Sequence, residues 1–243
     1  MGKLFDHFEV PHFTYPRTFQ YACIYSSIPL GLCSLAGLLA PGFLPPPSPS
    51  LSAEEIVSHY RHHEKGVLAS AALLVWSSFF YLAFTIAISN QLQHIPNVHY
   101  TIKTLQLMAG LVSSITFLGM GLLLALAAYR LERNVEITQL LNDLFWLIFD
   151  MGAVPSYFAQ YFAFGCSIMV DNNPKHPFPK AMGVSNIITA ILFVPGSLAV
   201  HIVKTGPMAW DGAVSFWLPL VAWCIQVGID IIYLTLAMFY EEH

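Results

Sequence analysis

The chain has 243 residues, of which 56% are hydrophobic and only 10% are charged. Soluble domains carry about 25% charged residues, so this composition argues against a water-soluble fold. The formal net charge is −4, and the basic residues are scattered along the chain. Without a basic cluster, nucleic acid is excluded as an expected partner. The composition therefore indicates an integral membrane protein.

Several long apolar runs follow a polar and aromatic lead at residues 1–18. A helix needs about 20 apolar residues to cross a bilayer. Six runs reach or approach this length, and we expect membrane spans at 19–40, 66–89, 104–128, 140–169, 181–203 and 213–239. The connectors are too short for a second domain. Residues 1–243 are therefore predicted to form one integral membrane domain, an all-α, polytopic transmembrane helix bundle of about six spans.

The first connector is predicted to begin as an extended segment and to end as a helix. Residues 41–51 contain a proline-rich run from Pro45 to Pro49, and proline interrupts helices because it lacks a backbone donor. Ser52 and Glu55 then have the spacing of a capping box. We expect a polar helix to start there and to run on into the second span.

The basic residues do not fix the orientation of the bundle. With six spans, one side carries Lys3, Arg17, Lys103, Lys175 and Lys180. The other side carries Arg61, Lys65, Arg130, Arg133 and Lys204. Orientation normally follows an excess of lysine and arginine on the cytoplasmic side, and here the two sides are equal. Both orientations stay open.

Carboxylates occur where a bilayer should exclude them. Glu136, Asp143 and Asp150 are seven residues apart, which is nearly two helical turns, so they share one stripe of the fourth span. Gln139 and Tyr157 fall close to that stripe. A charged side chain at the centre of a membrane helix costs roughly 2.5–3.5 kcal/mol on insertion scales. These acids should therefore face the bundle interior, either as functional groups or as hydrogen-bonding partners of a neighbouring helix.

A fourth acid, Asp230, lies inside the sixth span. Trp223, Gln226 and Tyr233 lie near its helical face at spacings of seven, four and three residues. Asp211 precedes this span in a connector, where it is either an interfacial turn residue or a functional acid. Intramembrane acids are rare and often mark proton or ligand sites, so both positions are candidates for function.

Aromatic residues make up 14% of the chain and are concentrated in the fourth span. Most of them are expected to pack against lipid or other helices. Aromatic faces also attract cations, by about 2 kcal/mol when desolvated, so an acid beside aromatic walls could form and guide a carbocation. The predicted catalytic candidates are Asp143, Asp150, Asp230, Glu136 and Asp211, with Asp143 or Asp150 as proton donor and Asp230 as helper. The predicted substrate-binding residues are Trp146, Tyr157, Trp223, Gln106, Gln139, Gln226 and Tyr233.

A histidine cluster gives a competing hypothesis. His59, His62 and His63 share one face of the predicted polar helix, and imidazoles so placed could bind a metal. Membrane desaturases and hydroxylases resemble this locally, but they need three such boxes. His94 and His99 give only one poor second match. Polar residues at a helix start near the headgroups explain the cluster more simply, and no metal or other cofactor is predicted.

Three segments carry a resemblance to known proteins. They are Glu136–Trp146, Phe178–Asn186 and the stretch from Pro195 to Trp217. From residue 52 onward, the chain resembles a group of small integral membrane proteins of actinobacteria and filamentous fungi. Within that size and type, it is similar to the membrane-bound terpene cyclases of fungal meroterpenoid pathways, of the ascochlorin and ascofuranone type.

The resemblance implies a redox-neutral, cofactor-independent reaction. The implied substrate is lipophilic: a farnesyl chain with a terminal epoxide, attached to an aromatic or polyketide head. An acid would protonate the epoxide, and the cation would close onto the chain alkenes. The resemblance transfers no catalytic residue by motif. It implies contact with membrane lipid and a location in the endoplasmic reticulum for a fungal protein, or in the plasma membrane for a bacterial one.

Two further classes compete with the enzyme. Acids on one stripe also suit a proton-coupled or small-molecule transporter, although the chain shows no inverted repeat. A membrane scaffold would use the same acids for packing, so their replacement would reduce stability. Substrate, product skeleton and oligomeric state stay open at this stage, as does the choice of proton donor among the acids.

Overall fold

The computed structural model describes residues 16–173 and 178–240. Within these residues the chain is helical and contains no strand. Six segments are long and apolar enough to cross a membrane: Arg17–Leu39, Glu64–Gln93, Tyr100–Ala128, Val135–Val170, Lys180–Ala199 and Ala213–Phe239. The predicted all-α bundle with six spans is confirmed, and this is the architecture of a multi-pass membrane protein. Most of the polar lead at residues 1–18 lies outside the described residues.

Several spans consist of more than one helical piece. The elements are α1 Pro16–Tyr25, α2 Ser27–Leu39, α3 Ala53–His62, α4 Glu64–Gln93, α5 Tyr100–Ala128, α6 Val135–Leu147, a π-helical turn Ile148–Gly152, α7 Val154–Val170, α8 Lys180–Ala199, a second π-helical turn Ala213–Trp217 and α9 Leu218–Tyr240. The first span breaks at Ser26, whose Oγ donates to the carbonyl oxygens of Cys23 and Phe80 at 2.6 and 2.9 Å. Such side-chain bonds to the backbone bend helices.

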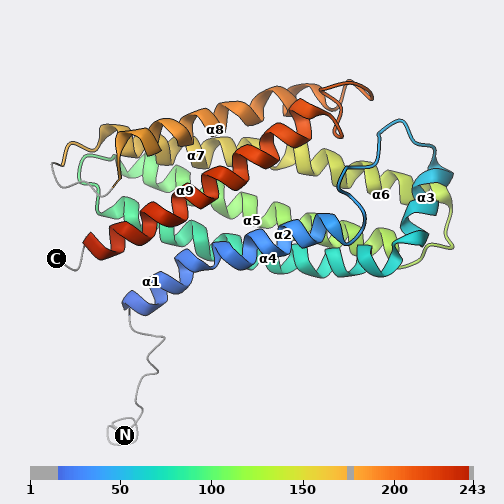
Figure 1. The fold of residues 1–243 in the computed structure, drawn as a ribbon, viewed down its shortest axis with the longest axis horizontal. Helices are drawn as coiled ribbons and strands as arrows, with labels where there is room; N and C mark the ends of the chain where they lie inside the picture. Colours follow the sequence, from blue (N-terminus) through green and yellow to red (C-terminus); the bar gives the residue numbers. More distant parts are fainter. Residues whose placement is uncertain (1–15, 174–177, 241–243) are drawn as a thin grey trace, which may run out of the picture.

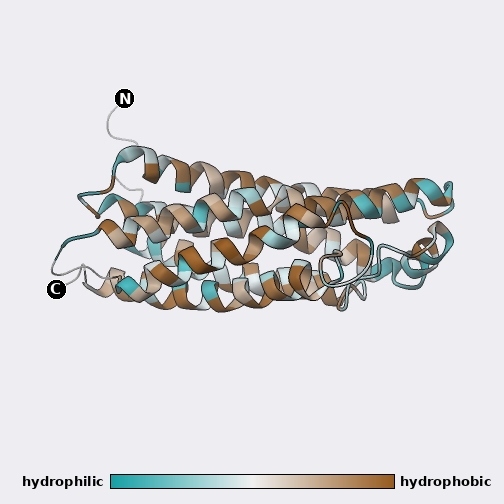
Figure 2. Ribbon diagram, turned by 90° about the horizontal axis from the view of Figure 1, so that it is seen from above, coloured by the Kyte–Doolittle hydropathy of each residue, from teal (hydrophilic) through white to brown (hydrophobic). Residues whose placement is uncertain are grey.

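The long helices lie side by side along the long axis of the molecule (Figure 1). α4 packs against α5, α7 against α8, and α2 against α4. Hydrophilic residues gather at both ends of the bundle, and hydrophobic residues fill the middle (Figure 2). α4 has 30 residues, which corresponds to about 45 Å, while the hydrocarbon core of a bilayer is about 30 Å thick. The longest helices therefore extend beyond the apolar layer or tilt within it.

This excess length explains where the predicted span limits differ from the helices. The second span continues to Gln93 and the fourth begins at Val135, both beyond the apolar runs at 66–89 and 140–169. A hydrophobic run marks the lipid-embedded part of a helix, whereas the helix itself continues through polar residues. The fifth span, α8, instead ends at Ala199, before the predicted limit of 203, and residues 200–203 form turns and an irregular segment.

Close contacts between helix backbones hold the bundle together. A Cβ at Gly165 of α7 would lie 2.7 Å from the carbonyl oxygen of Gly183 in α8, and a Cβ at Gly183 would lie 3.1 Å from that of Gly165. Small residues that let backbones approach are typical of membrane helix interfaces. The two glycines therefore fix the α7–α8 pair by removing side chains from the contact.

The polar helix α3 does not run on into the second span, contrary to the prediction. Its capping box is confirmed: Glu55 N donates to Ser52 Oγ at 3.3 Å, and Ser52 N donates to Glu55 Oε2 at 2.8 Å. The helix ends at His62, and His63 leaves the α-helical region with φ −109° and ψ 21°. α3 turns away and packs against α6 at one end of the bundle (Figure 1). Burial of Ile56, Val57 and Tyr60 drives this turn.

Candidate functional site

A cavity of about 400 Å³ lies inside the bundle. Side chains of α2, α4, α5, α6, α7, α8, α9 and the π-helical turn at 148–152 line it, and most of them are apolar. Its aromatic walls are Phe117, Phe145, Phe149, Tyr157, Phe193 and Trp223. Ligand cavities in proteins usually measure about 300–1,000 Å³ and are mainly apolar with a few polar groups. The cavity is therefore the strongest candidate site in the described part of the chain.

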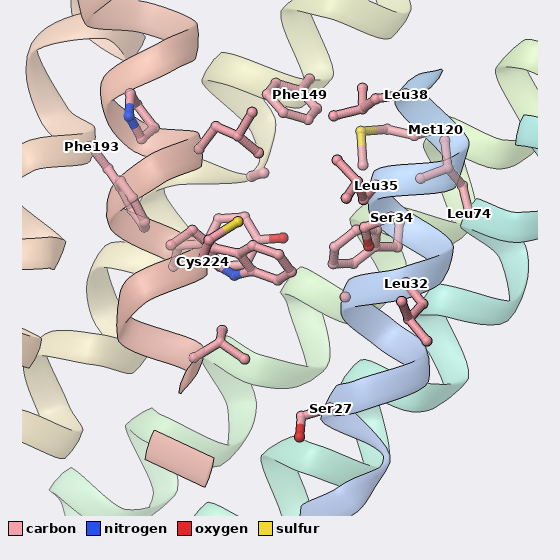
Figure 3. Close-up of a pocket in the computed structure, with 18 of the residues that line it drawn as sticks. Ser27, Leu32, Ser34, Leu35, Leu38, Leu74, Met120, Phe149, Phe193 and Cys224 are labelled. Atoms are coloured by element: carbon pink, nitrogen blue, oxygen red, sulfur yellow. The ribbon is translucent and has the colours of Figure 1, made fainter. Parts of the chain in front are cut away.

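The cavity lies between α2 and α9, with side chains of both helices along it (Figure 3). On α2, the lining residues Ile28, Leu32 and Leu35 are exposed, Leu32 to 65%. On α9, the lining residue Cys224 is exposed as well. Both helices belong to membrane spans, so the exposed edge of the cavity faces the region occupied by lipid.

Among the described residues that line this cavity, Asp150 is the only one with a carboxyl group. It is 3% exposed, and its Oδ2 is buried without a hydrogen-bond partner in the described residues. An ionised carboxylate in an apolar site needs a paired cation or several donors. None is present at Oδ2, so the environment favours the uncharged acid, which is a potential proton donor.

A π-helical turn positions Asp150. Ala153 N donates to the carbonyl oxygen of Ile148 at 2.9 Å, a bond across five residues that widens the helix. Pro155 follows at the start of α7 and removes one backbone donor from the helix, which disturbs regular α-helical bonding. Such turns inside α-helices are frequent at functional sites. The sequence pattern did not predict this turn.

The predicted acidic stripe does not enter the cavity as a unit. Glu136 is exposed in the first turn of α6, where the helix N-terminus favours a negative charge. Asp143 is half-buried near α3 and accepts a hydrogen bond from Asn142 Nδ2 at 3.3 Å. Asn142 in turn accepts one from the Tyr60 hydroxyl at 3.2 Å. Of the three acids on the stripe, only Asp150 reaches the cavity.

Asp230 belongs to a separate polar cluster between α8 and α9. Its Oδ1 accepts hydrogen bonds from Gln226 Nε2 at 2.8 Å and from Asn186 Nδ2 at 3.1 Å. Gln226 Oε1 also accepts one from Thr189 at 3.3 Å. These four side chains are buried and do not line the cavity. The geometry fits a role in holding α8 and α9 together.

Replacement of Asp230 by alanine is expected to lower stability by about 1–2 kcal/mol, since the buried donors of Gln226 and Asn186 lose their acceptor. Asp230→Asn keeps one acceptor oxygen and should cost less. The measurement is the apparent unfolding temperature of each purified variant in detergent, with Glu132→Ala as a control at an exposed position. Equal unfolding temperatures for Asp230→Ala and Glu132→Ala would contradict this role.

The remaining predicted residues divide between cavity and surroundings. Trp223 and Tyr157 line the cavity. Trp146 is fully buried, but it packs against Phe43 and Trp210 outside the cavity lining. Other candidates outside the lining are Gln106, which is fully buried and whose amide nitrogen and oxygen have no hydrogen-bond partner in the described residues, and the partly exposed Gln139, Tyr233 and Asp211.

Sequence reasoning missed the walls that come from other spans. The cavity is also lined by Phe117 of α5, by Phe193 of α8 and by one face of α2, which includes Ile28, Leu32 and Leu35. These residues lie in uniformly apolar runs, where nothing in the pattern separates a cavity-facing side chain from a lipid-facing one. Only the packing of the helices identifies them.

A cap segment, residues 41–62, closes the bundle end next to the cavity. Phe43 is fully buried, and its ring lies within 5.4–5.9 Å of the rings of His59, Tyr60, Phe145 and Trp146, centroid to centroid. Phe145 also lines the cavity. Trp210 Nε1 donates to the carbonyl oxygen of Pro47 at 2.8 Å, so the connector at 200–212 holds the cap segment in place. The cap segment thus separates the cavity from this end of the molecule.

Two of the clustered histidines, His59 and His62, belong to this cap segment, and His63 follows directly after it. His59 Nε2 donates to the Pro41 carbonyl oxygen at 2.8 Å, and His63 Nδ1 donates to the His59 carbonyl oxygen at 3.1 Å. The backbone therefore occupies one nitrogen of each of these rings. Across residues 16–173 and 178–240, no group of three or more His, Cys, Asp or Glu side chains is placed to hold a metal ion.

Acidification is expected to loosen the cap segment. Burial lowers the pKa of His59, opposed by its hydrogen bond to Pro41, and the nearby His63 and His62 lower it further. The unfolded imidazole binds a proton at about pH 6.5, so the stability contributed by neutral His59 is present above that pH and is lost as pH falls towards the folded pKa. Unfolding temperatures in detergent should therefore drop from about pH 7.5 to about pH 5.5, and drop less in His59→Gln. Identical pH profiles would contradict this.

Compared with known proteins, the chain matches no family model, no curated protein and no solved structure.

Proposed function

We propose that the protein is a membrane-embedded terpene cyclase, which closes an epoxidised prenyl chain by acid-initiated cyclisation in meroterpenoid biosynthesis. The observation that carries this proposal is the position of Asp150, a buried carboxyl group whose Oδ2 has no hydrogen-bond partner in the described residues, in an aromatic cavity with exposed lining residues on α2 and α9. A neutral carboxylic acid held in an apolar site is a known type of proton donor. The substrate is lipophilic and prenylated, and it is dissolved in the membrane lipid around the bundle.

The reaction starts when the Asp150 carboxyl group donates its proton to the epoxide oxygen. The epoxide C–O bond breaks as the π electrons of the nearest chain alkene form a new C–C bond. Positive charge then moves along the folded chain. The last cation loses a proton to the Asp150 carboxylate, directly or through a water molecule, which restores the acid. The epoxide oxygen becomes a hydroxyl group, so product and substrate have the same elemental composition.

The walls of the cavity suit a cationic intermediate. Phe149, Tyr157 and Trp223 line the cavity together with Asp150, and desolvated aromatic faces stabilise a nearby cation by about 2 kcal/mol. The cap segment and the surrounding lipid limit the access of water, which would otherwise capture the cation as an alcohol. In a fungal host the membrane would be that of the endoplasmic reticulum, and in a bacterial host the plasma membrane.

The proposal is tested with microsomes from a host that expresses the chain. An epoxyfarnesyl phenol is added with EDTA and without any cofactor, and the products are analysed by mass spectrometry. We expect an isomer of unchanged mass with a new retention time, absent from boiled membranes. No isomer across a panel of such substrates would contradict a cyclase and favour a transporter or scaffold. A product heavier by one oxygen atom, formed only without EDTA, would favour a metal oxygenase.

A further inference from the structure

Two glycines leave open space at the mouth of the cavity. Gly31 of α2 and Gly228 of α9 both line it, and a Cβ added at either position would meet no atom within 4 Å. Several other helical glycines are tightly packed: at Gly110 a Cβ would lie 2.2 Å from Thr85 Cγ2, and at Gly121 2.7 Å from the Ala71 carbonyl oxygen. Packing between helices therefore explains Gly110 and Gly121, but it does not explain Gly31 and Gly228.

We propose that the seam between α2 and α9 is a lateral portal, which admits a single hydrocarbon chain of sesquiterpene length from the bilayer. Each of the two helices that border the seam contributes one glycine, so the space next to Gly31 and next to Gly228 holds no side chain. A chain that enters through the seam reaches Asp150, whose Oδ2 has no hydrogen-bond partner in the described residues. The inference rests on the proposed function for its chemistry, but the entry route stands on the geometry alone.

The volume of the cavity sets the size of the occupant. An engineered cavity of about 150 Å³ binds benzene, which has six carbon atoms. At the same filling, the cavity of about 400 Å³ takes roughly sixteen carbon atoms. A fifteen-carbon chain therefore fills it, and a polar head group attached to that chain has no room inside. The head remains in the portal or in the lipid beside it, and the chain folds against Asp150.

The lining residues suit a chain and not a polar ligand. The α2 side contributes Ile28, Leu32, Leu35 and Leu38, and the α9 side contributes Leu220 among other apolar residues. Ser34 at this seam is in contact with Ser77, with 3.4 Å between their oxygens. Besides Asp150, polar atoms come from Tyr157 and from Trp223, whose buried Nε1 has no hydrogen-bond partner in the described residues. The rest of the lining is mostly apolar, and the transfer of apolar surface into it supplies most of the binding energy.

A photoaffinity experiment tests the portal independently of turnover. Purified protein in lipid nanodiscs is irradiated with a phenol that carries a fifteen-carbon isoprenoid chain and a diazirine at the chain end. The labelled residues are mapped by peptide mass spectrometry. We expect labels in residues 27–38 and 219–231, and competition by unlabelled fifteen-carbon chains but not by thirty-carbon chains. Gly31→Trp and Gly228→Trp should each reduce labelling by at least about tenfold.

Gly119 of α5 provides the matched control. A Cβ there also meets no atom within 4 Å, but the residue does not line the cavity, so Gly119→Trp should label like wild type. Full labelling of Gly31→Trp and Gly228→Trp, or labels confined to other helices, would overturn the portal. Labels at the seam without any cyclised product would refute the proposed function and keep the portal. If both seam variants formed cyclised product at the wild-type rate, the portal would be refuted and the proposed function kept.

Discussion

Replacement of Asp150 by asparagine is expected to reduce cyclisation by at least about 100-fold, since general acids in enzymes contribute about 10²–10⁴-fold. Asparagine has nearly the same volume and cannot protonate an epoxide. Because no other carboxyl group of residues 16–173 and 178–240 lines the cavity, no neighbouring acid in this part of the chain can replace it. The measurement is the initial rate of isomer formation in membranes that contain equal amounts of wild-type and variant protein.

Asp143→Asn is the matched control for this prediction. It makes the same chemical change seven residues earlier in the chain, at a half-buried site near α3 that does not line the cavity. We expect its rate to stay within a few-fold of wild type. Full turnover by Asp150→Asn, together with loss of turnover in Asp143→Asn, would show that Asp143 is the proton donor and would refute the assignment of Asp150.

Replacement of Phe43 by alanine is expected to have the largest effect on stability, about 3–5 kcal/mol, as for other fully buried phenylalanines. The Phe43 ring contacts four aromatic rings and ties the cap segment to Phe145 at the cavity wall. Its removal leaves a hole between the cap segment and α6. The measurement is the apparent unfolding temperature in detergent, with rates of cyclisation recorded below that temperature.

A lipid-facing phenylalanine controls for the loss of ring volume. Phe79 is 56% exposed on α4, and Phe79→Ala should change the unfolding temperature far less. In addition, Phe43→Ala should release a water-captured alcohol beside the cyclised product, because water reaches the cavity from the open end. If Phe43→Ala and Phe79→Ala unfolded at the same temperature, the cap segment would not be a structural part of the bundle.

The fold was largely predictable because hydrophobic length is a strong signal in membrane proteins. The six apolar runs identified all six spans, and the Ser52–Glu55 capping box located the start of α3. The break at His63 was not predictable from local sequence. It depends on the apolar face of α3, which packs against α6, and this is a contact between segments about 80 residues apart.

The candidate site was predictable only in part. A carboxylate inside a span is conspicuous, so Asp143, Asp150 and Asp230 were all singled out, but the seven-residue spacing assumed a regular helix. The π-helical turn and the depth of each helix in the bundle decide that only Asp150 lines the cavity. Gly31 and Gly228 gave no signal at all, because an unfilled position is visible only when the neighbouring helix is in place.

One isotope experiment tests the central claim, that Asp150 starts a cyclisation inside a dry cavity. An epoxide substrate is converted by purified protein in water enriched in oxygen-18, and the product mass is compared with that in ordinary water. The account predicts an isomer of unchanged mass in both cases, since the product hydroxyl group derives from the epoxide oxygen. A product heavier by one labelled water molecule would show that water, and not the chain alkene, captures the activated epoxide, and it would contradict the account.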